Sequence, residues 1–277
     1  MAFPLPTSLS PSKVSSFKDC ALAFRFSTID RLPEPPSPMA AKGTLVHRAL
    51  ELLFWEEEPG RRTLDAALGK LARARAEILG GSEFGDLGLT DDEAAEFTAD
   101  AEVLVRNYFE LEDPNAIRVI GTELLLEAQL GSLILRGIID RLELDDDGEL
   151  VVTDYKTGKA PWIAQEQSRL GGVHFYAFLC ERVLGRRPAR VQLLHLREPL
   201  TISTTPSQQS VHGLEVRARA VWSAVELACE REDFRPRPSH LCDYCAFKAY
   251  CPAWGGDPAL VPVRQKDEGE HQLPVSA

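Results

Sequence analysis

Aliphatic and β-branched residues dominate three segments in the middle of the chain, at 117–129, 133–144 and 149–155. Gly131-Ser132 separates the first two segments, and Asp-Asp-Asp-Gly at 145–148 separates the last two, both with turn chemistry. The pattern predicts successive antiparallel strands, with a β-hairpin formed by residues 138–144 and 149–155.

Elsewhere the apolar positions return every three or four residues, as on a helix that faces a core. After Gly43, apolar residues stand at 45, 46, 49, 50, 53 and 54. Capping boxes at 90–93 (Thr-Asp-Asp-Glu) and 205–208 (Thr-Pro-Ser-Gln) indicate the starts of two further helices. Helices are predicted over residues 10–26, from 43 to about 55, twice within 63–112, over 164–184 and over 205–232, with one more strand over 190–196.

Composition favours a protein with a sizeable core: the chain has 277 residues, and 44% of them are hydrophobic. It contains no apolar run of about 18 residues, and its first residues lack the basic start of a signal peptide. We therefore expect a soluble, cytoplasmic protein with no membrane association.

The net charge of -11 at pH 7 is unevenly distributed, because residues 83–113 alone hold eleven acids and one base. The remaining chain is nearly neutral and can still present a basic groove to nucleic acid. Candidates for such a groove are Arg182, Arg186, Arg187, Arg190, Arg235 and Arg237.

Asp140, Asp154 and Lys156 stand in or at the ends of predicted strands whose other positions are apolar. Two carboxylates in that setting repel each other unless a cation lies between them, and a divalent metal such as magnesium removes the difficulty. Asp154 and Lys156 are two residues apart and leave the same face of a strand, so Lys156 could orient a water and offset phosphate charge. This pattern favours phosphodiester hydrolysis; the alternative is a surface hairpin with an Asp-Lys ion pair.

His47 lies on the predicted helix after Gly43, where it is either a hydrogen-bonded core histidine or a ligand that meets these carboxylates. Near the C-terminus, C-x2-C-x5-C supplies three thiolates, Cys242, Cys245 and Cys251, which is typical of a metal centre. Zinc with His240 and an iron-sulfur cluster with Cys20 are both possible completions. Cys20 is expected inside the helix over 10–26.

The order of these motifs resembles the RecB-type branch of the PD-(D/E)XK nucleases, in particular stand-alone bacterial RecB family exonucleases, and beyond them the iron-sulfur nucleases of CRISPR adaptation and of AddAB. The likeness spans residues 10–256. It is carried by Ser10-Pro11-Ser12, Cys20, Gly43-Thr44, His47, Gly137, Asp140-Arg141, Asp154-Tyr155-Lys156-Thr157-Gly158, Tyr176, Cys242, Cys245 and Cys251-Pro252.

The resemblance implies an α/β fold: a restriction-endonuclease-like mixed β-sheet flanked by helices, with a helical insertion and a C-terminal iron-sulfur segment. We expect one domain over residues 1–256, with the insertion at about 59–115. The Cys-rich segment at 235–256 would pack on the N-terminal helix, and residues 257–277 would form a flexible tail.

The resemblance also implies roles for individual residues. Mg²⁺ or Mn²⁺ would be held by His47, Asp140, Asp154 and the backbone carbonyl of Tyr155, with Lys156 as the catalytic lysine alongside both aspartates. A [4Fe-4S] cluster, with zinc as the alternative, would be held by Cys20, Cys242, Cys245 and Cys251. Tyr176 and Arg141 are expected to help position the substrate.

The expected function is that of a metal-dependent DNA nuclease, acting on single strands or ends as an exonuclease in DNA repair, recombination or processing, with a helicase as a candidate partner. The rival is a catalytically silent DNA-binding module that serves as a scaffold for a helicase. Relatives carry a glutamine four residues before the helix tyrosine, where this chain has Gly172, and this departure is the best support for the rival.

Overall fold

The computed structural model describes residues 3–79, 87–159 and 163–262. The chain divides into two compact units, one formed by Thr7–Val14 and Pro35–Ala224 and the other by Met1–Pro6, Ser15–Glu34 and Val225–Ala277. Where the sequence predicts a single domain over residues 1–256, the structure therefore separates the sheet and its helices from the segments that carry the clustered cysteines.

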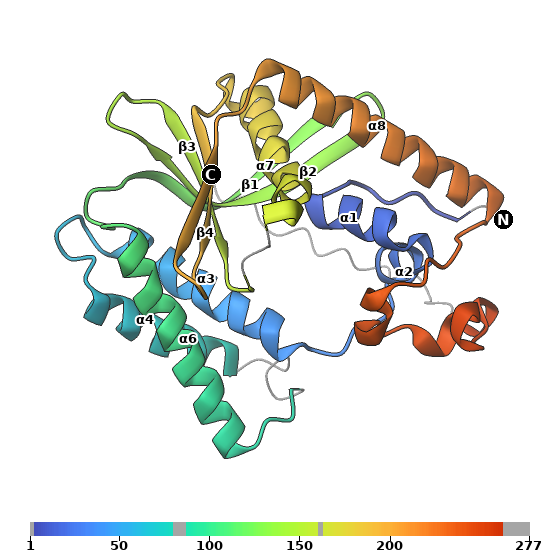
Figure 1. The fold of residues 1–277 in the computed structure, drawn as a ribbon, viewed down its shortest axis with the longest axis horizontal. Helices are drawn as coiled ribbons and strands as arrows, with labels where there is room; N and C mark the ends of the chain where they lie inside the picture. The colour runs from blue at the N-terminus through green and yellow to red at the C-terminus, as the bar shows by residue number, and fades with distance from the viewer. Residues whose placement is uncertain (1–2, 80–86, 160–162, 263–277) are drawn as a thin grey trace, which may run out of the picture. The chain divides into compact units, whose positions relative to one another are not determined.

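The larger unit is built on a five-stranded mixed sheet in the order β1-β2-β3-β4-β5 (Figure 1). β3 and β4 pair in parallel, and the other neighbours are antiparallel. The strands are β1 (Arg118–Leu130), β2 (Leu133–Leu144), β3 (Leu150–Lys156), β4 (Arg190–His195) and β5 (Leu200–Thr204). The expected strands are confirmed, and the short edge strand β5 is an addition to them.

Two tight turns join the first three strands where the sequence predicts them. Gly131 has a φ of 71° and Gly148 a φ of 75°, a conformation that glycine adopts at no steric cost. In the second turn the Asp145 carboxylate accepts the backbone N–H groups of Asp147 and Glu149, so the acidic turn residues close the hairpin.

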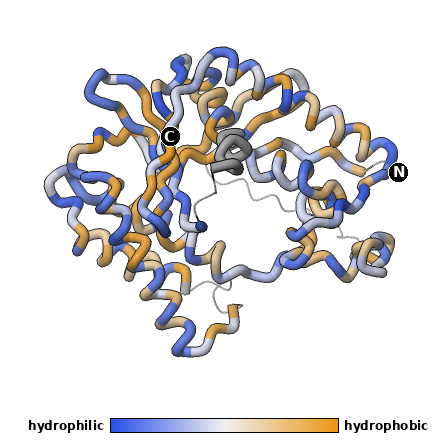
Figure 2. Tube along the Cα trace, in the orientation of Figure 1, coloured by the Kyte–Doolittle hydropathy of each residue, from blue (hydrophilic) through white to orange (hydrophobic). Residues whose placement is uncertain are grey.

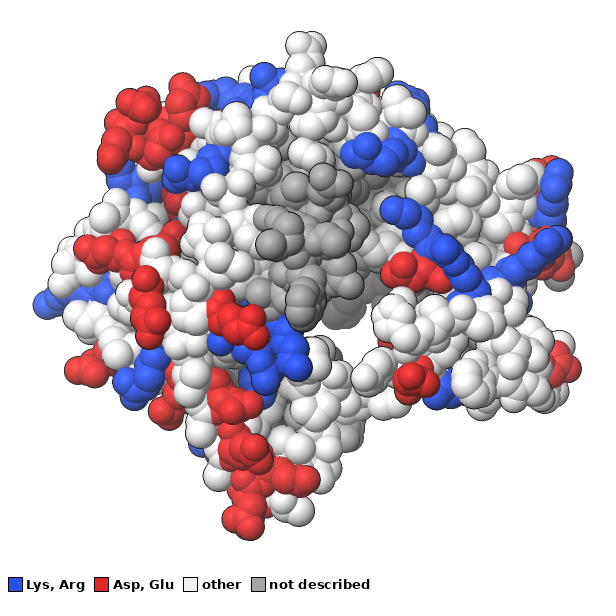
Figure 3. Space-filling model, in the orientation of Figure 1, with Lys and Arg blue, Asp and Glu red and all other residues white. Residues whose placement is uncertain are grey.

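Three helices cover one face of the sheet: α3 (Pro38–Glu56), α4 (Leu64–Leu79) and α6 (Asp91–Leu111). The apolar faces of these helices form one buried core with Tyr155 and Leu194 of the sheet and with Leu196, which follows β4. Hydrophobic and hydrophilic residues alternate along the three helices (Figure 2). The predicted helical insertion thus consists of α4 and α6. Acidic side chains gather over α6 (Figure 3), which holds the central part of the predicted acidic segment.

The connection from β3 to β4 passes through α7 (Ile163–Leu184), which packs against β1, β2 and β4. Gly137 permits this packing, because a Cβ there would lie 2.9 Å from Leu179 Cδ1 and 3.4 Å from Tyr176 Cε1. Side chains alternate across a strand, so α7 covers the face opposite to the α3-α4-α6 core. Tyr176 is thereby held over the strands that carry the aspartates.

Helix starts follow the sequence with two exceptions. Helix α3 begins at Pro38, five residues before the predicted start at Gly43. Thr90 and Glu93 form the predicted capping box of α6. The long C-terminal helix α8 (Gln208–Arg231) does not start with the predicted box at 205–208. Instead Ser207 and Ser210 each accept the other's backbone N–H, at 3.1 and 3.0 Å, because either hydroxyl can reach the first turn.

The smaller unit consists of the end of α8 from Val225, short helical segments and connecting loops. Instead of the continuous helix predicted over 10–26, α1 (Pro11–Asp19), which enters this unit at Ser15, ends at Cys20, whose extended backbone (φ -159°, ψ 108°) precedes α2 (Ala21–Phe24). Its other turns are η1 (Arg25–Ile29), η2 (His240–Tyr244), η3 (Lys248–Tyr250), η4 (Pro252–Trp254) and η5 (Pro258–Leu260).

Aromatic contacts bring the chain ends together inside this unit: Phe3 packs edge-on against Phe234, and Phe26 against Phe247 and Tyr250. The tail predicted from residue 257 includes the η5 turn and a buried Val261, while residues 263–277 lie outside the described part. No helix in the described ranges combines the length and apolar composition that a bilayer crossing requires.

Candidate functional site

The backbone pairing between β2 and β3 ends next to Asp140 and Asp154. The ladder runs from Leu144–Leu150 to Arg141–Thr153, so Asp140 and Asp154 stand one step beyond its last pair. There the backbone N–H of Tyr155 donates to Asp140 Oδ2 at 2.6 Å. A side chain thus replaces the backbone ladder, and Asp140 is fixed between the two strands.

Helix α3 brings His47 to the same place. Its Nε2 lies 3.1 Å from the carbonyl oxygen of Tyr155, and its Nδ1 lies 3.6 Å from Asp140 Oδ2. Gly43, one turn earlier, allows the approach, since a Cβ there would lie 3.1 Å from Thr157 Oγ1. Burial lowers the pKa of His47, which favours the neutral ring with a free lone pair, the form that binds metal.

Asp154 and Lys156 project from the end of β3 as their two-residue spacing predicts. Asp154 Oδ2 forms an ion pair with the Lys156 ammonium, and Asp154 Oδ1 accepts the hydroxyl of Tyr176 at 3.1 Å. The Asp154 side chain is only 5% exposed, whereas that of Lys156 is 43% exposed. The acid is therefore held from two sides, while the lysine can still reach a molecule from solution.

Glu123 is a member of this group that the sequence analysis missed. Its Oε1 lies 3.9 Å from His47 Nδ1, and donor atoms of His47, Glu123 and Asp140 all lie within 4.8 Å of one another. A signal was available, because counting equally from the turn at Gly131-Ser132 places Glu123 opposite Asp140. The flanking pairs of the β1-β2 ladder have this register.

The carboxylates of this group destabilise one another's charges. Burial first, and then the neighbouring Asp154, raise the pKa of Asp140 well above its ordinary range. Burial, Glu51 and Asp154 raise the pKa of Glu123 to about 7. A divalent cation would reverse both effects, and the carboxylate and carbonyl oxygens, which outnumber the single imidazole nitrogen, suit Mg²⁺ or Mn²⁺. The residues present therefore fit such an ion.

Arg141 does not fit the substrate-positioning role expected for it. Its side chain is 0% exposed and points to the face opposite Asp140, so it offers no surface to a substrate. It forms ion pairs with Glu112 and Glu143 instead. It also donates to three hydroxyl groups, those of Tyr108, Thr153 and Tyr155.

The arginines considered for a basic groove are mostly neutralised. Arg182 pairs with Glu215, Arg186 with Glu149, Arg187 with Glu181 and Arg235 with Asp233, at N···O distances of 2.6, 3.0, 3.6 and 2.8 Å. The guanidinium of Arg237 donates to the carbonyl of Lys18 at 2.9 Å. These contacts give little support to the predicted groove.

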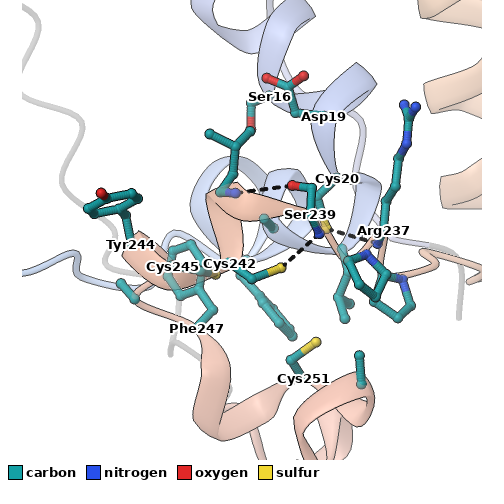
Figure 4. A pocket seen from close by; sticks show the side chains of 18 of the residues that line it. Ser16, Asp19, Cys20, Arg237, Ser239, Cys242, Tyr244, Cys245, Phe247 and Cys251 are labelled. Atoms are coloured by element: carbon teal, nitrogen blue, oxygen red, sulfur yellow. Dashed lines mark hydrogen bonds between the residues drawn. The ribbon is translucent and has the colours of Figure 1, made fainter.

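The smaller unit gathers the four cysteines assigned to a cluster around a cavity of about 240 Å³ (Figure 4). The Sγ atoms of Cys20 and Cys242 each face a backbone N–H, from Arg237 at 3.5 Å and Ser239 at 3.4 Å. The pKa of the Cys245 thiol is raised by burial and by its three cysteine neighbours. The break at Cys20 turns this residue out of the helical path and toward the others.

Comparison with known proteins assigns the family. A family model described as the PD-(D/E)XK nuclease superfamily matches residues 8–252. The chain belongs to this superfamily. In this PD-(D/E)XK protein, Asp154-Tyr155-Lys156 has the acid-x-lysine spacing of the superfamily name, and Asp140 precedes it along the chain, after Ile139 rather than a proline.

Individual relatives of this PD-(D/E)XK protein are distant. The Gene 69 protein of Mycobacterium phage D29 is 26% identical over 170 residues, which are 55% of this chain and 63% of that relative's length. A solved structure of a candidate exonuclease from Eubacterium rectale matches with a TM-score of 0.50 at 11% identity, over 86% of this chain and 87% of that one. The latter likeness shows the shared fold.

Proposed function

We propose that this protein is a metal-dependent DNA nuclease whose active site is formed by His47, Asp140, Asp154, Lys156 and the carbonyl of Tyr155. The proposal depends on one observation: an early helix and a later hairpin bring these five groups to one place. Family membership supports phosphodiester hydrolysis as the reaction.

The residues divide the work between holding an ion and contacting the substrate. His47, Asp140, Asp154 and the Tyr155 carbonyl would hold Mg²⁺ or Mn²⁺, which supplies charge to polarise the phosphate and to acidify water. Lys156, at the exposed edge of this group, would contact phosphate oxygen or help to deprotonate the attacking water. Tyr176 would keep the Asp154 carboxylate oriented through its hydroxyl.

A cleavage assay on end-labelled DNA tests the activity. Asp154→Asn and Lys156→Ala should each lower the rate at least about 100-fold, because each removes a charge from the reacting centre. Asp146→Asn, an acid of the exposed hairpin turn, is the matched control and should cleave like wild type. Full activity in both site variants would refute the assignment.

We also propose single strands or DNA ends as substrates, which would make the protein an exonuclease of repair, recombination or processing. The RecB-type motif order supports this specificity and a helicase partner. Substrates labelled at the 5′ or 3′ end, and circular substrates without ends, would separate exonuclease from endonuclease. The rival is a silent DNA-binding scaffold, which predicts DNA binding without cleavage; the complete set of metal-binding side chains and Lys156 argues against it.

For the smaller unit we propose a [4Fe-4S] cluster on Cys20, Cys242, Cys245 and Cys251, with a structural role. Two backbone N–H groups directed at sulfur support a thiolate-bound centre. In the described residues, no three of these cysteines have sulfurs within 4.8 Å of one another. A cubane separates its thiolates further than a single ion does.

The visible absorbance and the iron and zinc content of anaerobically purified protein would distinguish a [4Fe-4S] cluster from a zinc site. Cys242→Ser should lose the brown colour and most of the iron. Cys180→Ala is the matched control, since Cys180 is buried in the larger unit. If the protein contained one equivalent of zinc and no iron, the cysteine site would be a zinc site and the cluster proposal would be wrong.

A further inference from the structure

We propose that a cavity next to Lys156 binds the DNA backbone phosphate that flanks the reacting one, through the side chains of Lys42 and Arg197. The cavity has a volume of about 340 Å³ and is lined by Pro38, Met39, Lys42, Asp100, Val103, Leu104, Thr157 and Arg197. The inference rests on the proposed nuclease function and deepens it, since it assigns a substrate contact outside the reacting centre and a direction in which the DNA strand leaves.

The cavity begins where the strands of the candidate site end. Lys156 pairs with His195 in the parallel β3-β4 ladder, and the Lys156 carbonyl accepts the backbone N–H of Leu196 at 2.8 Å. Thr157 follows Lys156, Arg197 follows Leu196, and both of these next residues line the cavity. A DNA strand whose phosphate lies at Lys156 therefore has this cavity beside it.

Arg197 combines an anchored backbone with an exposed side chain. Asn107 of α6 donates its Nδ2 to the carbonyl of Leu196 at 2.8 Å and to that of Arg197 at 3.4 Å. The segment after β4 is thereby fixed against α6. Its guanidinium can pair with two phosphate oxygens at once, which is the geometry that arginine favours for such groups.

Asp100 of α6 holds Lys42 in the cavity. The Lys42 Nζ lies 2.6 Å from Asp100 Oδ2 and 5.7 Å from the centroid of the Phe97 ring. The hydrogen bond from Lys42, and then the charge of Arg197, lower the pKa of Asp100, so both cations act on this carboxylate. The Asp100 side chain is 54% exposed, so solvent screens the pair, and a DNA phosphate can replace the carboxylate at little cost.

The cavity also offers apolar surface beside its cations. Met39 of α3 and Val103 of α6 are 68% and 52% exposed, and Leu104 is buried behind them. Sites for single-stranded nucleic acid combine cations that follow the backbone with side chains that pack on the bases. The mixture of charge and apolar surface therefore fits a nucleotide better than it fits a free phosphate ion.

The middle of α3 is less suited to DNA than its first turns. A hollow of about 500 Å³ there is lined by Gly43, Thr44, His47, Arg48, Glu51 and Glu123. Arg48 forms ion pairs with Glu51 and Glu77 at 2.8 and 3.1 Å, so its charge is already neutralised. The remaining acidic surface repels phosphate, and the strand is expected to leave toward Lys42 and Arg197 instead.

The affinity for a single-stranded oligonucleotide, measured by fluorescence anisotropy in a chelator that prevents cleavage, tests this contact. Lys42→Gln and Arg197→Gln should each weaken binding about tenfold and lower the slope of log affinity against log salt by about 1, because each removes a phosphate contact. Arg106→Gln is the matched control, since it removes a cation of α6 that does not line the cavity. Its salt slope should equal that of the wild-type chain.

Asp100→Asn should have the opposite effect. It removes the carboxylate that competes with phosphate for Lys42, so DNA binding should tighten. Glu102→Gln removes the same charge from the same helix outside the cavity lining and should bind DNA like wild type. Equal tightening in both variants would assign the effect to the charge of α6 as a whole and would overturn the contact.

Oligonucleotides with a single neutral methylphosphonate linkage locate the phosphate. At one position near the reacting bond, the neutral linkage should weaken binding to the wild-type chain. It should cause no further loss in the double variant Lys42→Gln/Arg197→Gln, because the interaction is already absent. The same loss in both proteins at every sensitive position would place the phosphate contacts elsewhere and contradict the assignment.

The outcomes separate this inference from the proposed function. Wild-type affinity and salt slope in both cation variants, or no DNA binding by the wild-type chain in the chelator, would overturn the cavity contact. Cleavage of DNA with Mg²⁺ would still establish the nuclease in either case. Full cleavage by Asp154→Asn and Lys156→Ala would refute the reacting centre, and the inference that depends on it, whatever the binding results.

Discussion

The carboxylate of Asp140 both holds the backbone and faces the site. Its Oδ2 accepts the Tyr155 N–H at 2.6 Å and lies 3.6 Å from His47 Nδ1. Burial and Asp154 raise its pKa, so its charge is costly when no cation is bound. The Asp140 oxygen is needed to accept the Tyr155 N–H in the folded chain, whereas the negative charge is needed only to bind the ion.

Substitutions of Asp140 should separate these two requirements. Asp140→Asn keeps an acceptor for the Tyr155 N–H and removes the charge, so ion-free stability should be unchanged or higher. Asp140→Ala leaves a buried N–H without its partner and should lose about 1–3 kcal/mol. Urea unfolding in a chelator measures both, and equal destabilisation of the two variants would contradict the separation. Both should bind Mn²⁺ less tightly.

Glu123 should make the ion-free protein less stable at higher pH. Its folded pKa of about 7 exceeds the ordinary 4.5, so the folded state favours the protonated acid. This contribution is complete below about pH 4.5 and is lost as the pH rises through about 7. Burial is the main cause of the raised pKa; Glu51 and Asp154 raise it further, and Arg48 lowers it.

Thermal melts between pH 5 and 8 in a chelator test this prediction. The melting temperature should fall with rising pH in the wild-type chain and fall less in Glu123→Gln. The side chain of Glu123 is 34% exposed, so solvent screens part of the effect. An identical slope in both proteins would show that another group is responsible.

At the scale of elements, Arg141 fastens helix α6 to the hairpin that carries the site. Its guanidinium contacts Glu112, just after α6, at 2.8 Å from each outer nitrogen, and Tyr108 within α6. It also reaches Thr153 and Tyr155 of β3. The neighbouring residues Asp140 and Arg141 therefore lie on opposite faces of the sheet. Asp140 faces the candidate site, and Arg141 faces helix α6.

Arg141→Met should destabilise the larger unit by about 3–5 kcal/mol, because it leaves the buried Glu143 and the partly buried Glu112 without their cation. Arg136→Met on the same strand removes a half-exposed pair with Glu127 and should cost about 1 kcal/mol or less. Denaturant unfolding gives both values. A loss in Arg141→Met as small as that in the control would mean that the buried cluster is not needed for stability.

Helix α7 allows a test of the missing glutamine. Gly172 lies one turn before Tyr176, and a Cβ there would meet nothing within 4 Å among the described residues. Gly172→Gln should tighten DNA binding if this position contacts the substrate, as the family pattern implies. Gly172→Ala, which adds only helix propensity of about 1 kcal/mol, is the control. Equal DNA affinity in both variants would exclude a contribution from the amide.

The sequence predicted elements best where local chemistry determines them. The turns at Gly131-Ser132 and 145–148 place the hairpins, and helical periodicity identifies α3. Prediction from the sequence failed where tertiary contacts determine the structure. The helix predicted over 10–26 is interrupted at Cys20, and β5 was missed because it has only five residues. Burial of Arg141 could not be read locally either, because its acid partner Glu112 lies beyond the end of α6.

At the scale of the whole chain, two compact units divide the predicted chemistry. The larger holds the histidine, acids and lysine of the hydrolytic site, and the smaller holds Cys20, Cys242, Cys245 and Cys251. About 220 residues separate Cys20 from Cys242, so a shared cluster would close a very long loop. By analogy with cross-links, such closure stabilises by about 3–5 kcal/mol.

Loss of the cluster should therefore loosen one unit and spare the other. In Cys242→Ser, amide hydrogen exchange should accelerate in α2 and η2, because their thiolate anchors are gone, and remain slow in β2 and β3, whose ladder and core lie within the larger unit. Mn²⁺ binding should persist, since its ligands belong to that unit. Cys180→Ala controls for loss of a thiol alone. Exchange that accelerates equally in the sheet would show that the two units unfold together, and the cysteine centre would then stabilise the active site as well.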